Sequence, residues 1–264
     1  ASSSAADADF SGRTLTVGIW GGNDQETASI NQLKANFEAA HNCTVELKVY
    51  TDYNTQIQAD FIGKTAPDTF YIDGSMFAFY STLGVMDTLE PADYELDAFY
   101  ENLTSAFTTP DGEVMCVPKD VSTLATYYNE DLLADCGYTG DDIPDSYDKY
   151  MDFLTDVQSK LDAKYGKNQI AAMTYNQDLA RNLYILQDGS TGLCDADGNA
   201  TLDQEVVAKN LQFILDMTDA GVWKTPSDLG TGWNGEAFGT GKCAIMEEGN
   251  WVYGTLKKDY SDIK

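Results

Sequence analysis

The sequence predicts a two-lobed α/β protein, and three observations support that fold class. Segments with strand and helix patterns alternate from residue 14 onward, as they do in proteins built on parallel sheets. The chain has 264 residues, of which 43% are hydrophobic and 12% aromatic, enough for two lobes of ordinary domain size. From Phe238 to Trp251, a Gly-Thr-Gly turn, an apolar run, a further glycine and a helix start follow one another.

The first expected unit is a β-α-β unit. Apolar residues alternate with small or polar ones up to Trp20, which predicts a strand, and a second alternating strand covers residues 45–49. Between them, Asn23 followed by Glu26 fits a helix N-cap with an acidic third residue. Because the strands of such a unit are parallel, Trp20 and Asn23 are expected at the carboxyl edge of the sheet, where open α/β sheets bind ligands.

The same alternation continues through the middle of the chain. Helical patterns cover residues 57–62 and 99–107, and a buried strand is expected at residues 69–72. Pro110-Asp111-Gly112 predicts a hairpin turn that leads into the apolar run 114–117. Residues 124–129 are the next expected strand.

The later part of the chain supplies a second set of strands and helices. A long amphipathic helix is expected from Tyr150 to Leu161, and Tyr175 and Asn176 lie in the loop after a strand at residues 170–174. Two further helices are expected, over residues 179–189 and 206–220. Trp233 lies between glycines in a loop-like segment.

The segment that ends at Trp251 is a strand-to-helix corner. Its strand, Cys243 to Met246, is followed by two carboxylates, Glu247 and Glu248. Gly249 is expected to end the strand, and Asn250 to cap a helix that begins with Trp251. Taken alone, the corner predicts only a strand, a turn and a helix.

The charge of the chain disfavours several classes of partner. There are 43 acidic and 16 basic residues, which gives a formal charge of −27. Such a surface repels nucleic-acid phosphates and anionic lipids, so we expect no nucleic acid as a partner and no membrane docking through charge. The charge also argues against a strongly anionic ligand.

No metal site or cofactor is expected. Five cysteines without Cys-x-x-Cys spacing and a single histidine, His41, favour buried free thiols, with one disulfide as the alternative. Residues 195–201 space their oxygen atoms as a calcium loop does. However, Ala200 and Val206 occupy the positions of the required glycine and glutamate, so a simple turn is favoured.

Several motifs together resemble family 1 extracellular solute-binding proteins, the sugar receptors of ABC importers. The block from Phe238 to Trp251 is similar to that family's signature, with Ile245 at one methionine position. Other matching segments are Ala66-Pro67-Asp68-Thr69, Val117-Pro118-Lys119-Asp120, Tyr128-Asn129-Glu130-Asp131-Leu132 and Ile143-Pro144-Asp145-Ser146-Tyr147.

The resemblance implies a periplasmic-binding-protein-like (type II) fold with a hinge near Pro118 and a ligand cleft between the lobes. Residues 1–12 are then a flexible tether, residues 13–118 form lobe 1, and residues 119–264 form an incomplete lobe 2. A C-terminal return segment to lobe 1 is expected to be missing. The ligand implied is a neutral sugar or oligosaccharide that is delivered to permease subunits.

Candidate ligand-binding residues combine aromatic rings with hydrogen-bonding side chains, because sugars present both apolar faces and hydroxyls. The resemblance places Trp251 against the sugar, and Trp20 and Trp233 are further platforms, whereas Trp223 is interpreted as structural. The polar and remaining candidates are Asn23, Asp73, Ser75, Asp120, Tyr175 and Asn176. For Asp73, a plain helix cap is an equal alternative.

The alternative function is a secreted glycoside-active enzyme that uses carboxylates such as Glu247 with Glu248, or Asp73 with Asp120. Adjacent residues of a strand point to opposite faces, which weakens the first pair. Lys119 and Arg181 leave a weakly acidic sugar open as a ligand. The protein is expected to be a monomer that is extracellular or periplasmic, with a lipid anchor preceding its polar N-terminal segment.

Overall fold

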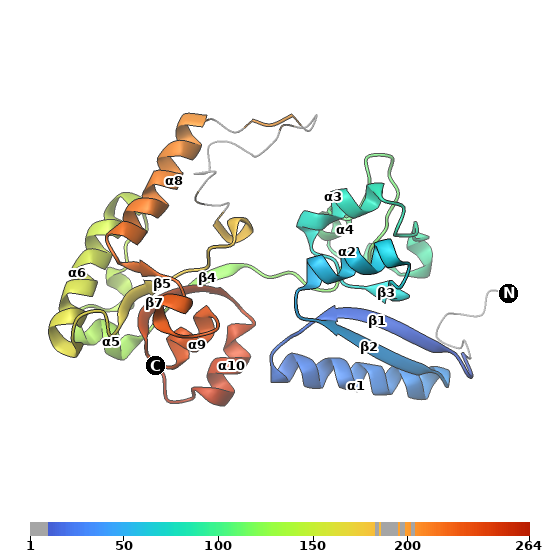
Figure 1. The fold of residues 1–264 in the computed structure, drawn as a ribbon, viewed down its shortest axis with the longest axis horizontal. Coiled ribbons are helices and arrows are strands. Elements are labelled where there is room, and N and C mark those ends of the chain that lie inside the picture. The colour runs from blue at the N-terminus through green and yellow to red at the C-terminus, as the bar shows by residue number, and fades with distance from the viewer. Residues whose placement is uncertain (1–9, 183–184, 186–194, 196–198, 202–203) are drawn as a thin grey trace. The chain divides into compact units, whose positions relative to one another are not determined.

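The computed structural model describes residues 10–182, 185, 195, 199–201 and 204–264, and the chain divides into two compact units (Figure 1). Unit 1 ends at Val121, and unit 2 runs from Ser122 to Lys264. The sequence placed the division after Pro118. Each unit contains its own β-sheet and its own apolar clusters, so each is described by itself.

Unit 1 is built on a parallel sheet. Its strands are β1 (Thr14–Trp20), β2 (Thr44–Tyr50) and β3 (Thr69–Phe70), in the order β2-β1-β3. Helix α1 (Asp24–His41) connects β1 to β2, and α2 (Tyr53–Gly63) connects β2 to β3. The predicted β-α-β unit is therefore confirmed, and Trp20 is the last residue of β1.

The close approach of β1 and β3 depends on small and polar residues. A Cβ atom on Gly18 would lie 2.7 Å from Pro67 Cγ and 3.1 Å from the Tyr50 ring, so a side chain at this position would clash. Asp68 Oδ2 accepts hydrogen bonds from the Thr16 amide (2.7 Å) and hydroxyl (2.8 Å). These bonds lower the pKa of Asp68 and fix the start of β3 beside β1.

One apolar cluster lies between this sheet and its following helices. Tyr50, Ile57 and Tyr80 are its buried members, and Tyr80 belongs to α3 (Gly74–Thr82). Beyond α3 the chain forms two 3-10 turns (Pro91–Asp93 and Leu96–Ala98) and the short helix α4 (Glu101–Ser105). At the predicted hairpin turn, the apolar run 114–117 contributes one antiparallel bridge, between Thr108 and Val114.

Unit 2 is built on a mixed sheet. Its strands are β4 (Leu124–Tyr128), β5 (Ala171–Thr174), β6 (Trp223–Lys224) and β7 (Cys243–Gly249), in the order β4-β7-β5-β6. Strand β4 pairs antiparallel with β7, whereas β5 is parallel to both β6 and β7. The carboxyl ends of β5 and β7 therefore lie at the same edge.

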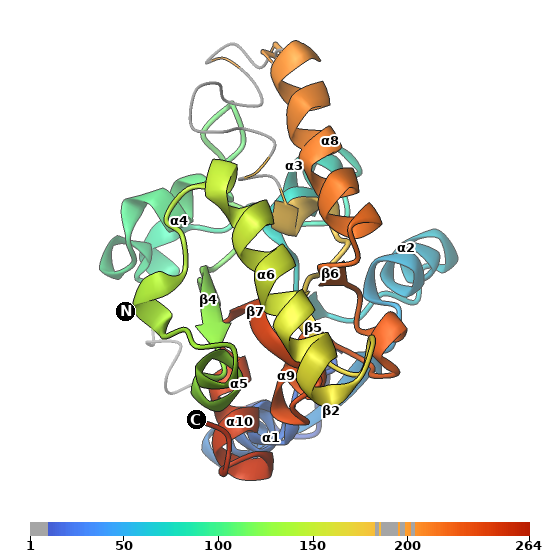
Figure 2. The same ribbon diagram turned by 90° about the vertical axis from the view of Figure 1, so that its left-hand side faces the viewer.

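Helices cover the unit 2 sheet in two groups (Figure 2). Helices α5 (Glu130–Asp135), α6 (Tyr147–Tyr165) and α8 (Gln204–Asp219) enclose the larger apolar cluster. Helices α9 (Asn234–Gly239) and α10 (Val252–Asp259) enclose a second cluster. Ile245 belongs to the first and Met246 to the second, because consecutive strand residues point to opposite faces.

Two local expectations for unit 2 differ from the structure, and one strand was not predicted. Helix α10 begins at Val252 with Trp251 at its N-cap, and the Asn250 side chain instead accepts a hydrogen bond from the Ser122 hydroxyl (3.0 Å). A short 3-10 helix, Leu179–Asn182, begins the segment expected to be helical, most of whose remainder lies outside the described residues. The two-residue strand β6 is too short for a pattern to predict it.

No helix in the described part of the chain is long and apolar enough to span a bilayer.

Candidate functional site

The carboxyl edge of the unit 1 sheet carries an aromatic cluster around Trp20. The Trp20 ring lies 4.8 Å from the Tyr71 ring and 5.3 Å from the Tyr53 ring, measured between centroids. Tyr71 directly follows β3, and its amide donates to Gly18 O (2.9 Å), which holds it beside the end of β1. Burial raises the pKa of Tyr71, so its hydroxyl stays protonated at neutral pH.

A cation lies over this cluster. Lys119 Nζ is 4.9 Å from the Tyr71 ring centroid and 5.7 Å from that of Trp20, within cation–π distance of both. Lys119 also forms an ion pair with Asp120, and both side chains are exposed to solvent. The edge thus presents apolar ring faces with one positive and one negative group beside them.

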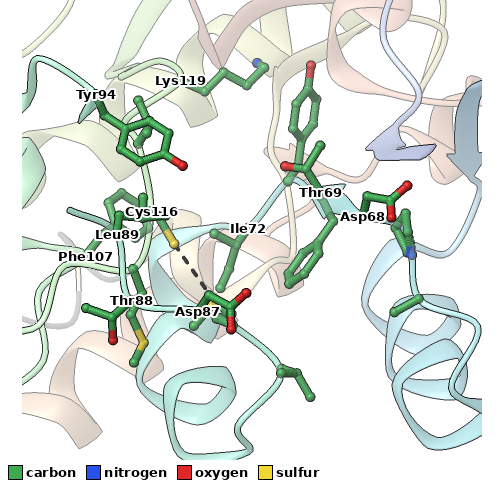
Figure 3. Close-up of a pocket in the computed structure, with 18 of the residues that line it drawn as sticks. Asp68, Thr69, Ile72, Asp87, Thr88, Leu89, Tyr94, Phe107, Cys116 and Lys119 are labelled. Atoms are coloured by element: carbon green, nitrogen blue, oxygen red, sulfur yellow. Dashed lines mark hydrogen bonds between the residues drawn. The ribbon is translucent and has the colours of Figure 1, made fainter. Parts of the chain in front are cut away.

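A pocket of about 690 Å³ adjoins the cluster and is lined only by residues of unit 1. In Figure 3, Tyr94, Phe107 and Cys116 lie across this pocket from Asp68 and Thr69. Burial raises the pKa of the Cys116 thiol to about 11, so this thiol is not ionised at neutral pH. Of the predicted site residues, Trp20 and Asp120 line the pocket.

The side chains of the other three candidates of unit 1 take part in hydrogen bonds at helix N-caps. Asn23 Oδ1 accepts from the amides of Gln25 and Glu26 (3.0 Å each), and Glu26 completes a capping box at the start of α1. Asp73 Oδ1 accepts from the amides of Ser75 (3.0 Å) and Met76 (3.2 Å) and from the Ser75 hydroxyl, which caps α3. The capping interpretation of Asp73 is therefore confirmed.

In unit 2, Trp251 follows the carboxyl end of β7 and lies next to an ion pair whose carboxylate is buried. The Glu248 side chain is 2% exposed and is paired through Oε1 with Arg181 Nη1. The Arg181 guanidinium carbon lies 5.1 Å from the Trp251 ring centroid. The ring also passes so close to Gly249 that a Cβ atom there would lie 2.1 Å from Trp251 Cζ3. Gly249 and Arg181 thus both constrain the position of this ring.

The remaining candidates of unit 2 lie in different surroundings. Trp233 is the half-buried N-cap residue of α9, and its ring packs over Gly235. Tyr175 is 7% exposed and packs on Trp223 with a 5.0 Å centroid distance, so its ring belongs to the core. Asn176 Oδ1 accepts from the Asp178 amide (2.7 Å), which shapes the loop after β5. Trp223 is 2% exposed, as expected for a structural residue.

The two adjacent carboxylates at the end of β7 do not face the same side of the sheet. Glu248 pairs with Arg181. The pKa of Tyr127 is raised mainly by the burial of that tyrosine and secondly by the negative charge of Glu248. The pKa of Tyr150, in the larger apolar cluster, is raised mainly by the burial of that tyrosine and secondly by the negative charge of Glu247. Glu247 and Glu248 therefore face opposite sides of the sheet and are not arranged as the acid and nucleophile of a glycosidase.

The calcium-like segment and the cysteines are only partly described. The carboxylate of Asp195 accepts hydrogen bonds from the Asn199 amide (2.8 Å) and side chain. Within the described residues, no group of three or more metal-ligating side chains converges. Cys43, Cys116, Cys136 and Cys243 are free thiols, and Cys194 lies outside the described residues.

Comparison with known families assigns the chain. A family model described as bacterial extracellular solute-binding protein matches residues 32–264, which is most of the sequence. The chain belongs to this family. No curated protein matches the sequence.

Two solved structures resemble this solute-binding protein in fold. An ABC substrate-binding protein of Listeria monocytogenes, in complex with cycloalternan, has a TM-score of 0.77 and 19% identity over 94% of this chain and 63% of that chain. The GacH receptor of Streptomyces glaucescens, known unliganded and in complex with acarbose, has a TM-score of 0.76 and 24% identity over 96% and 66%. The solute-binding protein thus spans about two-thirds of each, and the likeness confirms the two-lobed α/β binding-protein fold.

The sequence did not predict two contacts in the solute-binding protein's candidate site, the Arg181–Glu248 ion pair and the packing of Tyr71 against Trp20. The Arg181–Glu248 pair joins residues 67 positions apart, and no local pattern links them. Tyr71 was assigned only to a buried strand. The sequence offers one clue to the two cations, which is that basic residues are rare: Lys119 and Arg181 are two of only 16. Lys119 lies just before the end of unit 1, and Arg181 lies in the segment that follows β5.

Proposed function

We propose that this extracellular solute-binding protein is the substrate receptor of an ABC importer and binds a neutral sugar or oligosaccharide. The observation that carries the proposal is the position of Trp251. This half-buried aromatic ring lies at the carboxyl edge shared by β5 and β7, with an arginine beside it. Carboxyl edges are where open α/β sheets bind ligands, and an aromatic ring with adjacent hydrogen-bond donors suits a sugar.

The unit 1 edge supports the same class of ligand. Trp20 and Tyr71 present aromatic surface, while Lys119 and Asp120 provide a donor and an acceptor within the same cluster. A sugar needs all three, because its C–H faces pack on rings and its hydroxyls both donate and accept hydrogen bonds. We propose that Trp20 and Asp120 contact the ligand, and that Trp233 is a secondary platform in unit 2.

The roles of the other predicted residues are narrower. The carboxylate or amide oxygens of Asn23 and Asp73 are engaged in helix caps, and the Ser75 hydroxyl donates to Asp73. In this proposal these side chains shape the strand-end loops, as does Asn176. Tyr175 supports the loop from within the core.

Charge and family context support a neutral ligand and an importer. The formal charge of −27 opposes an anionic ligand. The two structural neighbours are an ABC substrate-binding protein in complex with cycloalternan and a receptor in complex with acarbose, which supports a carbohydrate ligand. The ligand-bound form would then deliver its sugar to membrane permease subunits.

The test is calorimetric titration of the protein with neutral oligosaccharides, including cycloalternan and acarbose, followed by product analysis. We expect binding of at least one sugar, its recovery unchanged, and loss of affinity in Trp251→Ala. One face of a tryptophan, roughly 100 Å² of apolar surface, contributes about 2.5 kcal/mol to binding, or about 70-fold in Kd. Unchanged affinity in Trp251→Ala would refute the assignment of this ring, and cleavage of the sugar would favour an enzyme.

A further inference from the structure

Unit 2 holds a charged group where an unpaired charge would be strongly unfavourable. The Glu248 side chain is 2% exposed, at the penultimate position of β7. Its Oε1 atom accepts from Arg181 Nη1 and also from the Gly249 amide at 3.1 Å. Ion pairing with Arg181 is therefore what allows a carboxylate to be buried at this position.

Arg181 combines this anchoring with partial exposure. It lies in the 3-10 helix Leu179–Asn182, and its side chain is 31% exposed. A guanidinium has five N–H donors in a rigid plane, and among the described residues Glu248 is its one side-chain acceptor. The pair with Glu248 therefore anchors the guanidinium through Nη1, with its carbon 5.1 Å from the centre of the Trp251 ring, while further donors stay available.

We propose that Arg181 is a specificity-determining residue of the Trp251 subsite, where it donates hydrogen bonds to neighbouring hydroxyls of the sugar ring packed on Trp251. Glu248 is a positioning residue that acts through Arg181. The proposal rests on the proposed function, since it concerns how the same site selects its sugar. The planar fork of a guanidinium matches two adjacent oxygen acceptors, a geometry that a lysine ammonium does not provide.

The pair also explains how an arginine serves a neutral ligand. The buried negative charge of Glu248 compensates the positive charge of Arg181, so the two groups together carry no net charge. Such a pair donates hydrogen bonds to a hydroxyl without requiring an anion from the ligand. A uronic acid would gain little from Arg181 and would meet the repulsion of a chain with charge −27.

The competing explanation is that Arg181 and Glu248 only stabilise unit 2. Selectivity separates the two explanations, because a purely structural pair has no influence on which sugar binds. Removing the charge of Glu248 leaves Arg181 positive, which should favour a carboxylate on the ligand. The informative quantity is therefore the ratio of Kd values for a neutral oligosaccharide and its equivalent with a terminal uronic acid.

The experiment compares four variants by calorimetric titration with the neutral oligosaccharide that the wild-type protein binds, and with its uronic-acid equivalent. Glu248→Gln frees the charge of Arg181, and Arg181→Lys keeps the charge but removes the fork. The double variant Arg181→Met/Glu248→Gln removes both charges, so no unpaired charge is buried and folding is preserved. Lys257→Met is the control, because Lys257 lies over an aromatic ring, Tyr253, at 5.8 Å but at an exposed position.

We expect Arg181→Lys and the double variant to bind the neutral sugar about tenfold or more weakly, as for lost hydrogen bonds to a charged group. Glu248→Gln should shift the Kd ratio about fivefold toward the uronic acid, and Lys257→Met should match wild type. Circular dichroism of each variant confirms folding.

Two outcomes overturn the proposal, and they are distinguishable. If the wild-type protein binds a neutral sugar and Trp251→Ala loses it, but the Arg181 and Glu248 variants keep both the affinity and the Kd ratio, the pair is structural and the proposed function stands. If the wild-type protein binds no sugar in the panel, the proposed function fails and this inference fails with it.

Discussion

Replacing Gly249 by alanine should move the Trp251 ring without deleting it. A Cβ atom at Gly249 would lie 2.1 Å from Trp251 Cζ3, whereas ordinary contacts begin at 3.4 Å, so the ring must shift by the difference of 1.3 Å. Alanine is compatible with the backbone here, because Gly249 does not have a positive φ angle. The perturbation therefore acts on the position of one ring.

The expected cost follows from the short range of dispersion. A gap of about 0.5–1 Å forfeits roughly a quarter to a half of the attraction between two atoms. Applied to a ring face that contributes about 2.5 kcal/mol, a 1.3 Å shift should cost somewhat more than half, about 1.4 kcal/mol, or about tenfold in Kd. Gly249→Ala should thus lie between the wild-type protein and Trp251→Ala.

The assay is calorimetric titration with the oligosaccharide that the wild-type protein binds, supported by near-ultraviolet circular dichroism of the tryptophans. Gly63→Ala is the matched control, because its nearest neighbour would be the Thr65 hydroxyl at an ordinary 3.4 Å. Wild-type affinity in Gly249→Ala, together with weak binding by Trp251→Ala, would refute the argument that Gly249 sets the ring position.

Three further predictions concern stability. Met246→Ala removes a fully buried side chain and should cost about 2–5 kcal/mol in urea unfolding, whereas Ile62→Ala, 86% exposed, should stay within about 0.5 kcal/mol. Asn23→Ala should cost about 1 kcal/mol through loss of the capping box, and an unchanged urea midpoint would contradict that role. The hydrogen bond from Lys48, followed by that from Tyr50, lowers the pKa of Asp60 from 3.8 to about 2. The stability contributed by Asp60 is therefore present above about pH 4 and lost as the pH falls toward 2, and Asp60→Asn should remove that part of the pH dependence.

The sequence predicts the strand framework well because each strand has a simple burial pattern. The alternation before Trp20 marks β1 to its last residue, and the apolar run at Cys243 marks the start of β7. Caps are predictable for the same reason, since Asn23 and Glu26 interact within one helical turn. Asn250 was assigned a cap on the same local logic, but its side chain is bonded to Ser122, more than a hundred residues away in sequence.

The site was predictable only in part, because its rings and its charges leave different signals. Tryptophans next to glycines at strand ends, such as Trp20 and Trp251, can be found by inspection. The partner of a buried charge cannot, because Glu248 meets Arg181 only after β5 and β7 have paired. For the same reason, sequence reasoning did not anticipate that Tyr175 packs on Trp223.

Helix α1 has a capping box at its N-terminus but buries little of its surface. None of its side chains is fully buried, and Leu33 and Phe37 are 62% and 39% exposed. Its links to the sheet include the Glu38 carboxylate, which accepts from the Val45 amide at 2.7 Å. Local opening of such an element needs little free energy, whereas the amides of β7 lie among fully buried residues. In a hydrogen–deuterium exchange experiment, α1 should therefore take up deuterium well before β7.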